Sequence, residues 1–280
     1  MPVRIVTDSA CDLPEPVCAD LGIAVVPLTI RFGEREFVDR QELSVDAFWR
    51  ELEASSVLPE TAAPSVGAFE ETFRRLSDEG ATGIVCVNLS ARLSATMQSA
   101  QVAAKALDGE IPIEIVDSQS ASMGIGNLVL HAARRARAGA SVEEIVADIE
   151  ARRVHQHVFA ALDTLEYLRK GGRIGGAQAL LGSVLSIKPV IAVVDGAVEP
   201  AGRVRTRSKA LRFLVDQIPA DGNIESLSVL HANAPDLDEF LAMLRPLVPD
   251  AEVTVGVIGP VIGVHTGPRV MGIAWIDRKE

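Results

Sequence analysis

The sequence predicts an α/β protein with two domains: an N-terminal parallel sheet with helices on both faces, and a C-terminal mixed α+β domain. Up to about residue 154, short aliphatic runs alternate with helical patterns, which is typical of a doubly wound parallel sheet. Beyond that point, the hairpin signal Asp195-Gly196 and the spacing of the later strands favour a mixed sheet. We therefore expect domains at residues 1–155 and 156–280.

In the N-terminal part, the expected strands are short apolar runs that end at polar or turn residues. They lie at residues 3–7, 23–31, 84–89 and 111–116. Residues 32–35, Phe-Gly-Glu-Arg, are typical of a tight turn, and Asp8 and Ser9 follow the first strand directly. The segment 59–64 begins and ends with proline and is expected to be irregular.

The expected helices of this part begin or end at residues that commonly cap helices. Pro14 can open a helix that Gly22 ends, because proline fits the first turn and glycine the left-handed cap. Serine N-caps are expected at Ser44, Ser65 and Ser141, the last with Glu144 in a capping box. Two further helices are expected, one ending at Ala106 and one following Gly124.

The C-terminal part opens with a glycine-rich stretch at 162–191. Its leucines at 162, 165 and 168 share one helical face, and two glycine pairs enclose Arg173, which indicates unusual backbone angles or close backbone approach. An apolar helix-like run then leads to a strand that starts near Lys188. Later strands are expected at 192–201, which contains the hairpin, and at 224–231, 253–258 and 270–276.

Composition and charge exclude several classes of protein. The chain is 48% hydrophobic but only 4% aromatic, so its core must be aliphatic. A net charge of −11 argues against a general nucleic-acid binder, which needs a basic surface. Cys11, Cys18 and Cys86 include no CxxC pair, which argues against a disulfide framework or a zinc site. Without a signal-peptide pattern or an apolar run of about 20 residues, we expect a cytoplasmic protein with no integral membrane segment.

Hydroxyl-bearing residues follow the carboxyl ends of the expected parallel strands, where open α/β sheets bind their ligands. They occur at 7–9, 90–96 and 117–122, and Thr61 and Ser65 add to them. Hydroxyl groups and helix N-terminal N–H groups favour an anionic or polar ligand. Ordinary N-capping is the alternative explanation for each residue taken singly.

Patterns for metal, nucleotide and hydrolase sites are weak. His155 and His157 would share a strand face, but no carboxylate or cysteine stands at ligand spacing. The pair at Gly124 and Gly126 lacks the third glycine of a dinucleotide fingerprint, and no P-loop or GxSxG motif occurs. A small hydrolase or phosphotransferase that uses Ser94 or Asp8 with His265 remains an alternative.

Two other features are a histidine in a glycine-containing segment and a cluster of basic residues. His265 lies in residues 263–268, Gly-Val-His-Thr-Gly-Pro, which are expected as a turn between two apolar strands. A cluster of cations stands out against the acidic background: Arg203, Arg205, Arg207, Lys209 and Arg212. The first three alternate as on one strand face, which indicates either a solvated face or a docking patch for an acidic partner.

The stretch LEYLRKGGRIGGAQALLGSVLSIKPVI at 165–191 resembles the hallmark segment of the DegV family, bacterial proteins with the EDD fold that bind a fatty acid. Further matching pieces occur in order along the whole chain. They are IVTDSACDLP at 5–14 and segments 61–65, 90–100, 117–126, 204–206 and 259–267.

The resemblance implies a tunnel between the two domains for one long-chain fatty acid such as palmitate, stearate or oleate. Thr61 and Ser94 match the hydroxyls that bind the carboxylate. Supporting residues near the head group would be His265, Asp8, Ser9, Ser118 and Arg173. The chain departs from the family pattern at Ala62, Arg92, Ala95 and Arg269, and we expect the Arg92 side chain to point into water.

The resemblance also implies a protein with no catalytic residues, no cofactor and no metal. It would present the fatty-acid carboxylate to a fatty-acid kinase and carry the acyl-phosphate toward phospholipid synthesis. Arg203, Arg205 and Arg207 would then dock the partner, and Arg173 or Arg205 would meet the partner or the phosphate. A regulator that changes shape when lipid binds is a third possibility.

Overall fold

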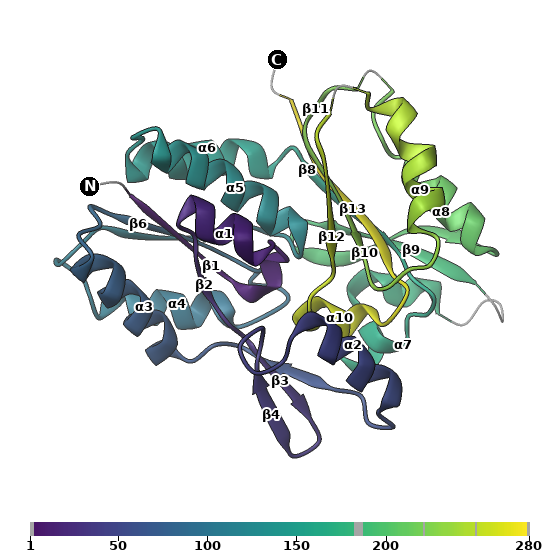
Figure 1. The fold of residues 1–280 in the computed structure, drawn as a ribbon, viewed down its shortest axis with the longest axis horizontal. Helices are drawn as coiled ribbons and strands as arrows, with labels where there is room; N and C mark the ends of the chain where they lie inside the picture. The colour runs from purple at the N-terminus through teal and green to yellow at the C-terminus, as the bar shows by residue number, and fades with distance from the viewer. Residues whose placement is uncertain (1–2, 182–186, 221, 250, 279–280) are drawn as a thin grey trace.

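The structure, a computed structural model, describes residues 3–181, 187–220, 222–249 and 251–278. Two main sheets stand side by side, the first on the left and the second on the right of Figure 1, and a small third sheet lies below them. The helix pair α5 and α6 lies above the first sheet in this view, and α2 and α10 lie below the second. The predicted α/β class is confirmed.

The first sheet is entirely parallel, with strand order β2-β1-β6-β7. Its strands are β1 (Arg4–Asp8), β2 (Ala24–Val26), β6 (Ile84–Asn88) and β7 (Ile113–Asp117). Alternate residues of a strand enter different cores: Val85 and Val87 pack in one cluster, whereas Ile84 and Cys86 pack in another. Both faces are therefore covered, which is why the sequence shows apolar runs without alternation.

Helices cover the two faces of this sheet. They are α1 (Glu15–Leu21), α3 (Val66–Asp78), α4 (Thr96–Lys105), α5 (Met123–Arg137) and α6 (Val142–Arg153), with a short 3-10 helix η1 (Ser9–Cys11) after β1. Helix α2 (Val45–Ala54) lies apart from them, beside α10. The predicted caps are confirmed, because Ser44, Ser65 and Ser141 each accept from a first-turn backbone N–H. The capping box of Ser141 and Glu144 is complete.

The second sheet is mixed, with strand order β10-β9-β8-β13-β11-β12. Its strands are β8 (Gln156–Ala161), β9 (Lys188–Val194), β10 (Ala197–Val204), β11 (Ile224–His231), β12 (Val253–Val257) and β13 (Met271–Asp277). The Asp195-Gly196 pair joins β9 to β10 with φ of 48° and 79°, as the hairpin signal predicted. The helices of this part of the chain are α7 (Glu166–Lys170), α8 (Arg207–Val215), α9 (Leu237–Leu244) and α10 (Pro260–Thr266), with the 3-10 helices η2 (Gly175–Leu180) and η3 (Arg245–Leu247).

Three local predictions were wrong. The apolar run 23–31 breaks into two strands, because the chain leaves the first sheet after β2 and forms β3 (Thr29–Phe32) of a separate antiparallel sheet. That sheet also contains β4 (Arg35–Val38) and β5 (Glu60–Ala62), so part of the segment expected to be irregular is a strand. The 263–268 segment is largely the helix α10, which Pro260 opens and Gly267 ends, and not a turn between strands.

Two further differences concern the C-terminal part. The strand alternation expected for Arg203, Arg205 and Arg207 stops at Val204, because Thr206 caps helix α8. The apolar run after Gly176 begins as η2 up to Leu180, and its residues 182–186 lie outside the described part of the chain. His155 precedes β8 in a turn, so the two histidines do not share a strand.

Helix α5 lies between the two sheets and fixes how they sit together. It packs against β1 and β6 of the first sheet and against β8, β11 and β13 of the second. Inside this contact Asn127 donates to the carbonyl of Ala274 and accepts from the hydroxyl of Ser228, at 3.4 and 2.9 Å. A buried polar network of this kind holds one relative placement of the sheets, because any other would leave the groups unpaired.

Candidate functional site

One large cavity lies where the two sheets and the small third sheet meet. It encloses about 1090 Å³ of space, part of which is open to solvent. Its walls come from the loops after β5 and β6, the start of α5, strands β8 to β10, and helix α10, as residues of all these segments line it. Residues from both halves of the chain therefore enclose one site.

A hydroxyl and an imidazole meet at one end of this cavity. Thr61 lies in β5, and its Oγ1 is 3.0 Å from Nε2 of His265 on α10. Both side chains line the cavity and are partly buried. The pairing brings together two residues that are 204 positions apart and that the sequence reasoning placed at the head group.

Desolvation, together with the nearby positive charge of Arg173, lowers the pKa of His265 to about 4. The imidazole is therefore neutral at pH 7. Its Nδ1 atom is buried without a hydrogen-bond partner, so Nε2 carries the only hydrogen bond that the described residues provide. Gly171 supports this position, because a Cβ at residue 171 would collide with Nδ1 of His265.

Ser94 stands in the turn between β6 and α4, near the same end. Its Oγ lies 2.8 Å from Oγ1 of Thr96 and accepts from the Thr96 backbone N–H at 3.3 Å. Thr96 is fully buried, whereas Ser94 is partly exposed and lines the cavity. Since a hydroxyl has one donor and two acceptor positions, Ser94 keeps capacity for one hydrogen bond beyond these two.

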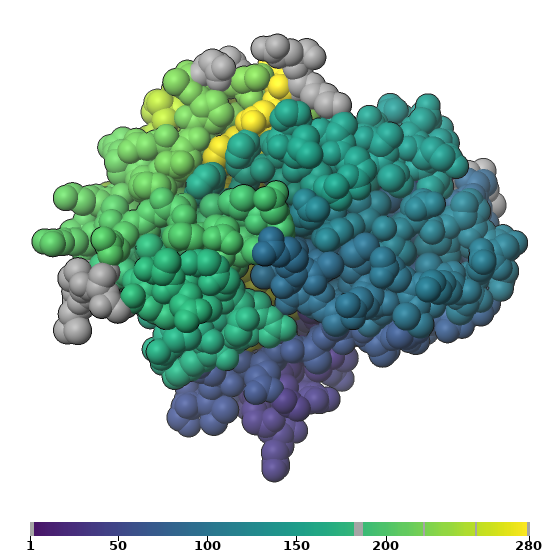
Figure 2. All heavy atoms as spheres, turned by 180° about the vertical axis from the view of Figure 1, so that it is seen from behind, coloured from purple at the N-terminus to yellow at the C-terminus, as the bar shows by residue number. Residues whose placement is uncertain are grey.

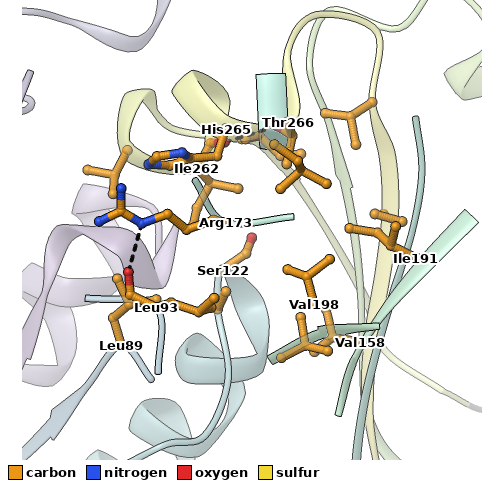
Figure 3. A pocket seen from close by; sticks show the side chains of 18 of the residues that line it. Leu89, Leu93, Ser122, Val158, Arg173, Ile191, Val198, Ile262, His265 and Thr266 are labelled. Atoms are coloured by element: carbon orange, nitrogen blue, oxygen red, sulfur yellow. Dashed lines mark hydrogen bonds between the residues drawn. The ribbon is translucent and has the colours of Figure 1, made fainter. Parts of the chain in front are cut away.

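Arg173 provides the positive charge of the site. Its Nε donates to the carbonyl of Leu93 at 3.0 Å, and its Nη1 donates to the carbonyl of Gly171 at 2.8 Å. Figure 3 shows the guanidinium beside the ring of His265, on the side of the cavity away from Val158, Ile191 and Val198. Two backbone carbonyls thus hold an arginine at the polar end of an otherwise aliphatic cavity.

The rest of the cavity wall is aliphatic. The sheet face contributes branched and small side chains, and the helices and loops contribute leucine and isoleucine. These residues include Leu28, Leu89, Leu168, Val158, Ile191, Val193, Val198, Leu230, Ile258, Val261, Ile262, Val270 and Ile273. Such a lining offers dispersion contacts and no hydrogen bonds, which suits a hydrocarbon chain.

The other predicted supporting residues do not line the cavity. Asp8 is fully buried and accepts hydrogen bonds from Ala10, Asn88 and Leu89 at the end of β1. Ser9 accepts from the Leu28 N–H, and Ser118 bonds to the backbone of Ser120. Each of these groups already has partners within the protein and shapes the loops, as the N-capping alternative proposed.

The basic cluster is divided by the fold. Arg207 is partly buried and forms a two-point ion pair with Asp236, with N–O distances of 2.8 and 3.1 Å. Arg203 lies on the edge strand β10, and Arg205 is exposed in the bend before α8. The three arginines therefore do not form one exposed strand face, because Arg207 lies on helix α8 and its charge is matched by a carboxylate.

Two polar residues make contacts that the sequence did not indicate. Ser122, the last residue of the 117–122 segment, lines the cavity with a φ of 55°, and its hydroxyl donates to Asp12 at 2.6 Å. Arg92 is exposed, as expected, but it also donates from Nη1 to the carbonyl of Asp195 at 3.0 Å. The departure of Arg92 from the family pattern was the signal available in the sequence.

The described residues offer little support for an enzyme or metal site. No hydrogen bond joins Ser94 to His265 within the described ranges, since their recorded partners are Thr96 and Thr61. No group of three His, Cys, Asp or Glu side chains in this part of the chain is placed to hold a metal ion. Among the same residues, no helix is both long and apolar enough to cross a membrane.

Comparison with known proteins gives matches over almost the whole chain. Residues 2–278 match the family model described as "Uncharacterised protein, DegV family". A DegV domain-containing protein of Streptomyces coelicolor is 41% identical, with 99% of each chain covered.

Solved structures agree with this result. A DegV family protein from Thermus thermophilus, described by its fatty acid binding, matches with a TM-score of 0.89 and 33% identity over 99% of this chain and 100% of the other. A stearic acid-binding protein from Eubacterium ventriosum gives a TM-score of 0.89 and 27% identity, covering 99% of this chain and 98% of the other. Both matches cover nearly the whole length of each chain.

Proposed function

Because this chain belongs to the DegV family, whose solved members include fatty acid binding proteins, we propose that it binds one long-chain fatty acid in the cavity between its sheets. The observation that carries this proposal is the polarity of the cavity: hydroxyl, imidazole and guanidinium groups meet at one end, and the remaining wall is aliphatic. A fatty acid has the same division between a carboxylate and a hydrocarbon chain. The expected division at residue 155 fits this placement, with residues 1–155 and 156–280 each supplying part of the wall.

The carboxylate would accept hydrogen bonds from Thr61 and Ser94. A neutral His265 can donate its Nε2–H to Thr61 Oγ1, which directs the Thr61 hydroxyl hydrogen toward the ligand. Arg173 adds a positive charge close by without a direct ion pair being required. Hydrogen bonds to an ionised group are worth about 1.5–3 kcal/mol each, so two hydroxyls give a strong preference for a carboxylate over a neutral head.

The acyl tail would occupy the aliphatic part of the cavity. Burial stabilises such a chain by about 0.8 kcal/mol for each CH₂ before losses, so a chain of palmitate, stearate or oleate length supplies most of the binding free energy. Binding of this kind needs no catalytic group, cofactor or metal. We therefore propose a carrier that performs no chemistry itself.

A carrier that keeps the carboxylate of its bound fatty acid accessible can present this group to a second protein. We propose that this partner is a cytoplasmic fatty-acid kinase, which phosphorylates the carboxylate so that the acyl-phosphate can pass toward phospholipid synthesis. Arg203 and Arg205 are the docking candidates, because both side chains are exposed, whereas Arg207 is partly buried. Arg173, which lines the cavity, would meet either the partner or the phosphate.

The proposal is tested by native mass spectrometry of the purified protein, followed by organic extraction of any bound molecule. We expect a stoichiometric adduct that extracts as a fatty acid. Delipidated protein should take up added palmitate, stearate or oleate at one molecule per chain, and Ser94→Ala should bind it more weakly. Protein that carries no lipid and takes up none of the three acids would rule the proposal out.

A further inference from the structure

One segment of the N-terminal half forms a continuous piece of the cavity wall. Leu89, Leu93, Ser94 and Ala95 all line the cavity, and they surround the carboxylate-binding position. Residues 89–95, called the wall segment below, join β6 to α4 and contain no regular secondary structure. A long ligand must pass some part of the wall to exchange with solvent, and irregular segments open at lower cost than strands.

The tip of the β9–β10 hairpin meets the wall segment. This hairpin lines the opposite side of the cavity with Ile191, Val193 and Val198. In a two-residue turn, the carbonyls of the turn residues have no partner in the ladder and usually face water. Here both turn carbonyls are taken by the wall segment: Ser90 Oγ donates to Gly196 at 2.7 Å, and Arg92 Nη1 donates to Asp195 at 3.0 Å.

These contacts differ in their surroundings. Ser90 and Gly196 are buried, and a Cβ on residue 196 would lie 3.4 Å from the Cβ of Ser90. Arg92 is exposed and reaches across the junction from outside. The Arg173 bond to Leu93 gives the wall segment a third link to the C-terminal half. Figure 2 shows this side of the molecule, where blue atoms of the N-terminal half meet green atoms of the C-terminal half.

We propose that the wall segment and the hairpin tip form the closure of the cavity, and that Ser90 and Arg92 set how fast the fatty acid exchanges. This inference rests on the proposed function, because it concerns release of the same ligand. Neither residue lies at the carboxylate. Their loss should therefore speed association and dissociation together, while the equilibrium affinity changes little.

Removing the two donors provides the test. Ser90→Ala deletes the hydroxyl that donates to Gly196, and Arg92→Ala deletes the guanidinium that donates to Asp195. Gly196 itself is left unchanged, because its φ of 79° disfavours any other residue. Thermal unfolding of each variant checks that it is folded before exchange is compared.

The measurement is a chase: protein loaded with palmitate is mixed with excess deuterated palmitate, and the mass of the complex is followed by native mass spectrometry. We expect exchange in Ser90→Ala to be about 3- to 10-fold faster than in the wild type, the size of effect that one hydrogen bond gives. Arg92→Ala should exchange about 3- to 10-fold faster than the wild type, since it loses one hydrogen bond. Arg134→Ala, which removes an exposed arginine on α5, should leave the rate unchanged.

The two proposals fail in different ways. Wild-type exchange rates in both Ser90→Ala and Arg92→Ala, each loaded with palmitate, would overturn the closure. Wild-type rates in Arg92→Ala alone would remove Arg92 from it. Failure of the wild type itself to load with palmitate would instead overturn the proposed function.

Discussion

Replacing Thr61 by valine removes one hydroxyl and preserves the shape of the side chain. Thr61 Oγ1 contacts His265 Nε2 at 3.0 Å and lines the cavity, so the exchange deletes the proposed donor to the carboxylate and leaves the β5 backbone in place. A hydrogen bond to a charged group is worth about 1.5–3 kcal/mol. The dissociation constant for palmitate should therefore rise by about 10- to 150-fold.

The assay is a titration of delipidated protein with palmitate, followed by displacement of a fluorescent fatty acid. Thr266→Val is the matched control, because Thr266 also lines the cavity but donates its hydroxyl to the Ile262 carbonyl at 3.0 Å within α10. Thr266→Val therefore loses a hydroxyl, as Thr61→Val does, but this hydroxyl is not a proposed donor to the carboxylate. Its dissociation constant should stay within about threefold of the wild type, as expected for less than one hydrogen bond.

Stability must be measured beside affinity, since Thr61→Val also leaves His265 Nε2 without its partner. We expect a loss of about 1 kcal/mol in the free energy of unfolding, which is the usual net value of one hydrogen bond. If Thr61→Val folds and binds palmitate as tightly as Thr266→Val does, the carboxylate does not contact Thr61 and the assignment of the polar end is refuted.

Three further predictions concern protonation and capping. The imidazole of His265 should titrate near pH 4 in NMR spectra, because burial lowers its pKa; a value near 6.5 would show that the ring is solvated. Burial raises the pKa of Asp39 to about 6, so the folded protein binds an extra proton between about pH 4 and pH 6, and the stability contributed by this group is lost as pH rises through 6. Asp39→Asn should therefore raise Tm at pH 7 and flatten the pH dependence of Tm, whereas an unchanged profile would contradict the buried charge. Ser141→Ala should cost about 1 kcal/mol in chemical denaturation by removing the capping box, and Ser77→Ala, outside any N-cap, should cost less.

The fold class was predictable because its signals are local. Alternating apolar and helical runs, serine caps and the Asp195-Gly196 hairpin each act within about ten residues, and the structure confirms them. The small third sheet was missed since it pairs β3 with β5, and nothing in segment 59–64 alone marks it as a strand. Its existence depends on a partner some thirty residues away.

The candidate site was predictable only where a resemblance supplied it. Composition and spacing give many hydroxyls at loop positions, and Asp8, Ser9 and Ser118 belong to the same pattern as Ser94. The structure separates them by burial: the first three are enclosed with partners in the protein, whereas Ser94 lines the cavity. Which hydroxyl faces a ligand is decided by packing between the two sheets, and no periodicity in the sequence records that packing.

The position of Ser94 links ligand binding to closure of the cavity. Ser94 lies in the same short segment as Ser90 and Arg92, which hold the hairpin tip, and next to Leu93, which Arg173 holds. A carboxylate bound to Ser94 would restrain this segment further, so the bound ligand would stabilise the contacts that keep it enclosed. Opening the segment would conversely weaken the hydrogen bond between Ser94 and the carboxylate before the acyl tail is exposed to water. If the proposed function holds, this arrangement would protect the acyl chain from water and release it from the head-group end.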